Sequence, residues 1–223
     1  MIAIPTWGTE TMAAGPSTPN RVDRRKERTR NALLGAARQL LADGRTAVSI
    51  QEITDAADVG FGSFYNHFDT KEDLFRAAVA STVEEWALFR DEAVAALDDP
   101  AEVFAASFRM AGRLQRQAPE LARALLNSGL GVLTHDQGLA PRARRDIETA
   151  TAAGRFDVAD PDMALMAVGG SLLGLLHWLD VHPEADAAAL SDEMAVRVLR
   201  MLGVPKREAV RLCSRPLPSE PRP

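Results

Sequence analysis

The chain has 223 residues, of which 46% are hydrophobic and 26% are charged, and its formal net charge is −5. This composition suits one or two domains with a real core and excludes a wholly disordered chain. A single cysteine, Cys213, excludes a disulfide framework and a cysteine-based zinc site. Residues 1–20 have no signal-peptide pattern, and the longest apolar run, Met163–Leu176, is shorter than a bilayer span. We therefore expect a soluble cytoplasmic protein with no membrane partner.

The charges are unevenly distributed along the chain. The stretch Arg21–Arg30 holds six basic and two acidic residues, although the whole chain carries more acidic than basic side chains. A basic front end on an acidic body indicates two tasks on one chain and favours a polyanionic partner for the front end.

Apolar residues recur at helical spacing along most of the chain, and we find neither an alternating strand pattern nor an internal repeat. The first helix is predicted over Arg24–Ala42, with Gly44 as its stop signal. The sequence Ser-Ile-Gln-Glu beginning at Ser49 is a capping box, which starts a second helix. Val59–Gly62 interrupts that helix, and a short third helix is predicted over Ser63–Phe68.

Caps and prolines mark the later helices. Thr70 has the character of a cap and opens a long helix whose apolar positions continue to Leu97. Prolines that follow an aspartate or an alanine predict helices over residues 100–117, 119–133 and 161–181, and a further helix is predicted over residues 187–202. Residues 135–155 stay unassigned because Gly138 and Pro141 interrupt the pattern.

Two short helices joined by a glycine-containing turn and braced by a longer helix form a helix-turn-helix. Its second helix would enter a DNA major groove. Phe64 and Phe68 are expected to face the core of this unit, and Tyr65 to lie near its rim. No acidic residue occurs from Val59 to Phe68, which suits a polyanion. The pair Gly60 and Gly62 imitates the start of a dinucleotide fingerprint, but the third glycine and the preceding strand are missing.

The segment from Ser49 to Leu74 resembles the TetR family of transcriptional repressors. It contains an Ala-Asp-Val-Gly turn, a Tyr-Asn-His-Phe recognition helix and a Lys-Glu-Asp-Leu opening to the fourth helix. The resemblance covers about residues 26–86. Thr54 and Asp58 depart from the usual Ala and Gly, but aspartate tolerates a left-handed backbone, so the turn should survive.

The resemblance implies an all-α protein. An N-terminal three-helix helix-turn-helix DNA-binding domain (21–70) follows a disordered arm (1–20). An antiparallel helical ligand-binding and dimerisation domain (71–203) precedes a frayed, Pro-rich tail (204–223). The implied partners are a palindromic or near-palindromic double-stranded DNA operator, a second copy of the chain and an unknown small-molecule effector.

The predicted DNA contacts combine motif positions with exposed polar positions. The resemblance implies phosphate contacts for Tyr65, His67 and Lys71. Ser63 and Asn66 are candidate base readers, although solvent exposure explains their polarity equally well, and Ser49 caps its helix whether or not it also meets a phosphate. The full predicted set is Arg25, Ser49, Phe61, Gly62, Ser63, Tyr65, Asn66, His67 and Lys71.

The last two helices are implied to form the dimer interface. The run Met163–Leu179 is apolar nearly all round, so it must be covered on more than one side. Small residues along this run would permit close approach of another helix, and the next helix has an apolar stripe. The alternative is that these apolar residues form the core of a monomer. The predicted interface residues are Gly170, Gly174, Leu190, Met194, Val198 and Met201.

Aromatic residues on the body helices are candidates for an effector pocket, although such residues more often form core. A core histidine is the alternative interpretation of His177. Arg109, Arg113 and Arg116 share one helical face, which we expect to be solvent-exposed. The predicted pocket residues are Trp86, Phe89, Phe104, Phe108, His177 and Trp178, and they favour a mostly apolar effector.

No enzyme motif is present: we find no metalloprotease HExxH, nucleophile elbow or P-loop. We therefore predict no catalytic residues, no metal and no cofactor. The predicted function is a repressor released from its operator by a small molecule. One alternative is a DNA-binding architectural protein whose body only dimerises. Another is a helical small-molecule enzyme, which requires that the basic front end does not bind DNA.

Overall fold

The computed structural model describes residues 21–134 and 138–218, so the arm predicted over residues 1–20 lies outside the described residues. The described residues are helical, with no strand among them, which confirms the all-α prediction. The α-helices are α1 (Arg21–Ala42), α2 (Ile50–Ala56), α3 (Phe61–Phe64), α4 (Lys71–Val94), α5 (Pro100–Gly112), α6 (Leu114–Gln117), α7 (Pro119–Ser128), α8 (Leu139–Ala152), α9 (Pro161–Val181), α10 (Ala187–Met201) and α11 (Lys206–Cys213), and the 3-10 helix η1 spans Gly129–Thr134.

Helices α1 to α3 and the start of α4 form a small unit with its own core, in which Phe64, Ile53 and Leu74 are fully buried. The predicted capping box is present: the Ser49 hydroxyl accepts from the Glu52 amide, and the Glu52 carboxylate accepts from the Ser49 amide. Thr70 caps α4 by accepting from the Asp73 amide. Local side-chain chemistry therefore sets both helix starts.

The turn between α2 and α3 depends on Asp58, whose φ of 53° places it in the left-handed region. Aspartate adopts this backbone more readily than most residues, so the family's usual glycine is not required here. The third helix was predicted over Ser63–Phe68 but instead begins at Phe61 and ends at Phe64. The chain then continues as a turn, in which the Phe64 carbonyl accepts from the amides of His67 and Phe68 at 2.9 and 3.0 Å.

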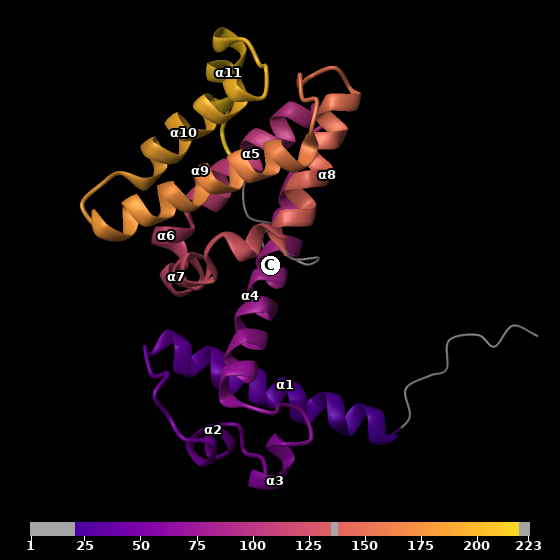
Figure 1. The fold of residues 1–223 in the computed structure, drawn as a ribbon, viewed down its shortest axis with the longest axis vertical. Coiled ribbons are helices and arrows are strands. Elements are labelled where there is room, and N and C mark those ends of the chain that lie inside the picture. The colour runs from indigo at the N-terminus through magenta and orange to yellow at the C-terminus, as the bar shows by residue number, and fades with distance from the viewer. Residues whose placement is uncertain (1–20, 135–137, 219–223) are drawn as a thin grey trace, which may run out of the picture.

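Helix α4 leaves the N-terminal unit and runs into the body formed by the later helices (Figure 1). In the body, α5 packs against α8, α9, α10 and α11, and α8 packs against α9. Residues 139–152, which the sequence left unassigned, form α8 and contribute the fully buried Ile147 to the core. The helix α4 is thus shared by both parts of the molecule.

One described helix, α9, is long and apolar enough to cross a membrane by length and composition alone. The same composition is expected of a core helix in a soluble protein, so this is weak evidence for a span. Leu165, Leu176 and Leu179 of α9 are buried in the body. Packing in the body therefore accounts for part of the apolar composition of α9.

The end of the chain differs from the frayed tail that we predicted. Residues 206–213 form α11, which packs against α10 and α5 and buries Ala209, Leu212 and Cys213. A guanidinium nitrogen of Arg155 donates to Glu208 at 2.8 Å and ties α11 to the end of α8. These apolar positions follow a helical spacing, but the surrounding prolines obscured it.

The prediction that Arg109, Arg113 and Arg116 share a solvent-exposed face is wrong for Arg109, which is buried, and for Arg113, which is partly buried, whereas Arg116 is exposed. Arg109 is only 5% exposed, and its Nε lies 2.7 Å from Oδ1 of Asp192 on α10. The Nη2 atom of Arg113 lies 2.8 Å from the same oxygen. Arg116 donates to the Leu179 carbonyl near the end of α9 at 3.1 Å. These arginines therefore bind other helices of the body.

Candidate nucleic-acid interface and effector cavity

The surface around α3 exposes aromatic side chains. Phe61 and Tyr65 are 47% and 52% exposed, although their neighbour Phe64 is fully buried. The Tyr65 ring stands edge-on to both phenylalanine rings, with centroid distances of 5.8 Å to Phe61 and 5.3 Å to Phe64. Gly62 and Asn66 are exposed beside them, whereas Ser63 and His67 are partly buried. The core does not account for the exposed rings, which are available to a partner.

Basic residues of α1 stand beside this surface. The Arg30 guanidinium lies 5.4 Å from the centroid of the Phe68 ring. Partial burial, followed by the charges of Arg30 and Lys26, lowers the pKa of His67 from its ordinary value. Arg25 is exposed on the same helix. The arrangement places positive charge next to residues 59–68, which include no acidic side chain, and such an arrangement favours phosphate binding.

Two of the predicted phosphate ligands also hold the unit together. The Lys71 ammonium donates to the Val48 carbonyl at 3.0 Å, and thereby ties the start of α4 to the loop before α2. The Ser49 hydroxyl is bonded to Glu52 within the capping box. Substitution of either residue will therefore change local structure as well as any contact with DNA.

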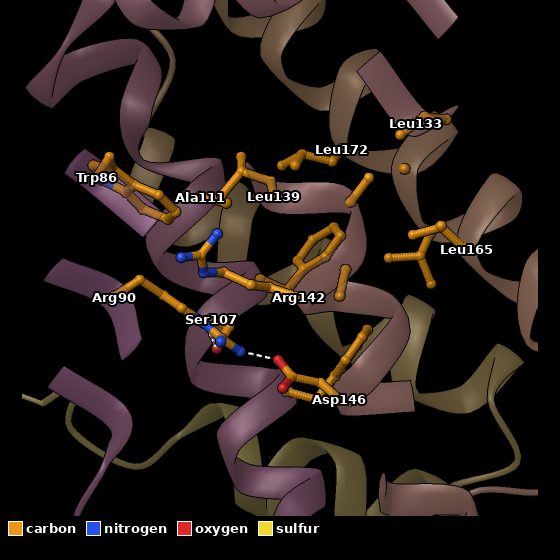
Figure 2. A pocket seen from close by; sticks show the side chains of 16 residues that line it. Trp86, Arg90, Ser107, Ala111, Leu133, Leu139, Arg142, Asp146, Leu165 and Leu172 are labelled. Atoms are coloured by element: carbon orange, nitrogen blue, oxygen red, sulfur yellow. Dashed lines mark hydrogen bonds and ion pairs between the residues drawn. The ribbon is translucent and has the colours of Figure 1, made fainter. Parts of the chain in front are cut away.

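A cavity of about 80 Å³ lies in the body between α4, α5, α8, α9 and η1 (Figure 2). Three of the predicted pocket residues, Trp86, Phe104 and Phe108, line it. The remaining lining residues are Arg90, Ser107, Ala111, Leu133, Leu139, Ala140, Arg142, Ala143, Asp146, Leu165, Val168, Gly169 and Leu172. The wall is mostly apolar, and its charged groups come from α4 and α8.

One end of the cavity is polar. The guanidinium of Arg90, which is 3% exposed, forms an ion pair with Asp146 and donates from Nε to the Ser107 hydroxyl at 2.7 Å. Figure 2 shows this pair on the side of the cavity away from Leu133 and Leu165. Burial lowers the pKa of Arg90 from its ordinary value, and hydrogen bonding to Asp91 opposes that change. The cavity therefore has mostly apolar walls and, at one end, the ion pair of Arg90 and Asp146.

Arg142 extends this network along α4. It donates to Glu84 at 2.7 Å and to Asp91 at 2.8 Å, and these two carboxylates lie two turns apart on α4. The bond from Arg142 lowers the pKa of Glu84. Burial opposes a similar change at Asp91, but the bonds from Arg142 and Arg90 outweigh it and lower its pKa. One side chain of α8 therefore holds α4 beside the cavity.

Comparison with known proteins identifies both parts of the chain. The profile described as "Bacterial regulatory proteins, tetR family" matches residues 33–78, and "Tetracyclin repressor-like, C-terminal domain" matches residues 99–215. The second match covers more than half of the chain. The chain belongs to the TetR family. A search of curated proteins gave no match.

Solved TetR-family structures share the fold. The structure of RolR in complex with resorcinol is 34% identical, with coverage of 89% of this chain and 99% of that chain and a TM-score of 0.67. RolR without ligand is 34% identical, with coverage of 86% and 100% and a TM-score of 0.71. A TetR-family regulator from Pectobacterium atrosepticum is 24% identical, with coverage of 82% and 96% and a TM-score of 0.60.

The other three predicted pocket residues lie outside this cavity of the TetR-family body. Phe89 does not line the cavity and packs against the cluster that contains Val94 and Met110. Trp178 is 53% exposed and stacks on His182 with a centroid distance of 3.8 Å. His177 is exposed and borders a separate open hollow between α7 and α9. An apolar helix does not reveal by sequence which of its faces points inward.

Sequence reasoning missed Arg90, Ser107, Arg142 and Asp146. The one available signal was Arg90, which occupies a position on the apolar stripe of the predicted long helix. Its partner Asp146 lies 56 residues further along the chain, in a segment that had no assigned structure. No metal-binding group of histidine, cysteine, aspartate or glutamate is found among the residues that the structure describes.

Most of the predicted dimer residues are exposed or partly buried, and one of them is buried in the core of its own chain. A side chain added at Gly170 or Gly174 of α9 would meet nothing within 4 Å in the single chain. Met201 is 50% exposed, and Leu190 and Met194 are partly buried. Val198 differs, because it is 2% exposed and belongs to the core of its own chain. Together with exposed Met163, Trp178 and Val181, the glycines give α9 an open apolar face.

Proposed function

We propose that this TetR-family regulator represses transcription by binding a palindromic operator as a cytoplasmic homodimer, and that a small molecule in the body cavity releases it. The observation that carries the proposal is the mostly apolar cavity beside α4, the helix that the body and the DNA-binding unit share. A ligand can change operator affinity only if it favours one body shape over another.

Two consecutive carboxylates of α4 support the link between the cavity and DNA. Glu84 accepts from Arg142, which lines the cavity, whereas Glu85 forms an ion pair of 2.5 Å with Arg38 on α1. A ligand that displaces Arg142 therefore acts on the same turn of α4 that holds the N-terminal unit. A change in α4 would alter the separation of the two recognition helices and their match to successive major grooves.

The cavity supports a single-ring aromatic effector that carries hydroxyl groups. Its volume of about 80 Å³ is small, and Trp86, Phe104 and Phe108 supply apolar walls. Arg90, Asp146 and Ser107 add a polar end, so a mostly apolar effector could carry a hydroxyl group there. RolR, which is 34% identical, has been crystallised with resorcinol, a ring with two hydroxyl groups.

The test begins with operator sites selected from random DNA by the full-length protein. We expect half-site centres about 34–36 Å apart and affinity that falls steeply with salt. Resorcinol or a related phenol should lower the affinity by about 5- to 150-fold. Substitution of Tyr65, His67 and Lys71 together by alanine should weaken binding to every sequence. Full operator affinity in that variant, with circular dichroism showing a folded protein, would refute the DNA assignment.

The proposed dimer is tested separately. Gly170→Leu and Gly174→Leu should weaken self-association, because the added side chains meet open space in one chain and would meet the partner in a dimer. Analytical ultracentrifugation of the unmodified protein should show a dimer at micromolar concentration. A monomer there would exclude the proposed mode of operator binding.

A further inference from the structure

The first residue of α3 carries an exposed apolar ring that lies outside the core. Phe61 is 47% exposed, and α3 lies at the end of the molecule opposite the body (Figure 1). In the core of the N-terminal unit, α3 is represented by Phe64 instead. A phenylalanine side chain has no hydrogen-bonding group, so this position can recognise a partner only by apolar contact.

Glycines on both sides leave this ring uncovered. Gly60 and Gly62 are exposed, and neither has the positive φ that would require glycine. A Cβ added at Gly62 would meet nothing within 4 Å, and one at Gly60 would lie 3.7 Å from the Ser63 hydroxyl oxygen, an ordinary contact. The fold therefore accepts larger residues at both positions. The missing side chains keep the surface beside Phe61 open for the close approach of a partner.

Neighbouring rings hold the Phe61 side chain in place. The Tyr65 ring stands edge-on to Phe61 at a centroid distance of 5.8 Å. Tyr65 is also edge-on to the fully buried Phe64, at 5.3 Å. The core thus supports the exposed ring through one intermediate ring. A ring that is already positioned loses little side-chain freedom when a partner binds.

The surroundings of the ring favour DNA as its partner. No acidic residue occurs from Val59 to Phe68. The positive charges of Arg30 and Lys26 on α1 reach His67 in the same segment and help to lower its pKa. The second helix of a helix-turn-helix lies in the major groove, where its first residues meet base edges. Those edges present hydrogen-bond donors and acceptors, and the 5-methyl group of thymine is their apolar feature.

We propose that Phe61 reads one thymine in each operator half-site by contact with its 5-methyl group. The inference rests on the proposed operator binding and names a base that the operator must contain. Cytosine and uracil carry only a hydrogen at this position, so the ring would lose its contact with either base. Ser63 and Asn66, which can form hydrogen bonds, stay candidates for reading other groups on the base edges.

Deoxyuridine substitution tests the proposal, because it removes the methyl group of thymine and keeps every hydrogen-bonding group. An operator is first selected from random DNA by the full-length protein, and symmetry-related thymines are then replaced one pair at a time. At one pair we expect binding to weaken about fifteen-fold, or about four-fold per half-site, as the loss of one buried methyl group predicts.

Phe61→Ala identifies the residue responsible. It should bind the thymine and deoxyuridine operators equally at that pair, because the contact is absent from both complexes. Tyr65→Phe is the matched control, since it keeps the ring against Phe61 and removes the hydroxyl that is predicted to meet a phosphate. It should weaken binding to both operators and leave their affinity ratio at about fifteen-fold. Anisotropy titrations at low salt keep all these affinities measurable.

Photocrosslinking covers the case in which Phe61→Ala does not fold. The analogue 5-iododeoxyuridine carries an iodine of nearly the size of the methyl group at the same position, and ultraviolet light couples it to a nearby aromatic side chain. With this analogue at the sensitive thymine, tandem mass spectrometry of the crosslinked peptide should place the link at Phe61.

Equal affinity for thymine and deoxyuridine at every pair would overturn the inference and leave the proposed function intact. A sensitivity that persists in folded Phe61→Ala, or a crosslink at another residue, would overturn the assignment to Phe61. Selection of no operator at all would overturn the proposed function, and this inference with it.

Discussion

The arginines of α1 and the arginines of the body occupy opposite environments. Arg25 and Arg28 are exposed at the start of α1, whereas Arg90 and Arg109 are 3% and 5% exposed and paired with carboxylates of other helices. Exposed cations remain available to an external polyanion, and buried ones hold the helices of the body to one another. Arginine therefore has different roles in the two regions: on α1 it is available to bind a partner, and in the body it holds helices together.

The largest expected effect is the loss of the buried cation of the body. Arg90→Met removes the partner of Asp146 and one of the partners of Asp91, so the Asp146 carboxylate stays unpaired in a buried site, whereas Asp91 keeps Arg142. We expect the free energy of unfolding to fall by about 3–5 kcal/mol, measured by urea denaturation.

Arg25→Ala is the matched control on α1, and it should change the unfolding free energy by less than about 0.5 kcal/mol. A loss below about 1 kcal/mol in Arg90→Met would mean that the ion pair does not support the body, and the contrast between the two regions would fail.

A second test concerns the glycines of α9. A Cβ at Gly169 would lie 2.2 Å from Leu133 Cδ2, whereas one at Gly170 would meet nothing within 4 Å. Gly169→Ala should destabilise the body by about 1–3 kcal/mol through overpacking, and Gly170→Ala should not destabilise the single chain. Thermal unfolding of both variants checks the difference. Equal stability of the two would show that η1 moves freely away from α9.

The capping box of α2 gives a smaller, local effect in the N-terminal unit. Ser49→Ala removes the acceptor for the Glu52 amide and should lower stability by about 1 kcal/mol. Hydrogen exchange should report faster opening of α2 and unchanged protection of α10. Equal losses of protection in both helices would show that the two units unfold together.

The smallest expected effect concerns the salt dependence of operator binding, which should distinguish the arginines of α1 from those of the body. Arg25→Ala should reduce the salt dependence of operator binding by about one counter-ion per subunit while stability stays the same. Arg109→Ala should lower stability and leave the salt dependence of operator binding unchanged, because the partner of Arg109 is Asp192 rather than a phosphate. Fluorescence anisotropy over a range of salt concentrations measures the slope. Equal slopes for Arg25→Ala and the unmodified protein would place Arg25 away from DNA.

The same contrast explains what the sequence could predict. The N-terminal unit depends on local chemistry: the Ser49 cap, the Asp58 turn and the burial of Phe64 all follow from neighbouring residues. These features were predictable from spacing. The length of α3 was not, since the turn after Phe64 keeps hydrogen bonds close to those of a helix.

The body depends on pairs far apart in sequence. Arg109 meets Asp192 across 83 positions, and Arg90 meets Asp146 across 56. An arginine on a helix gives no sign of such a partner, so the face of Arg109 was expected to meet water. For the same reason the sequence identified three aromatic residues of the cavity wall but none of its charged residues.

The cysteine of α11 provides the protein with its own reporter of unfolding. Cys213 is 4% exposed, and burial raises its pKa to about 11, so the thiolate that reacts with disulfide reagents and alkylating agents is scarce in the folded chain. Because it is the one cysteine of the sequence, any thiol signal reports a single location. The rate of labelling would thus measure how often α11 detaches from α5 and α10, without any introduced probe.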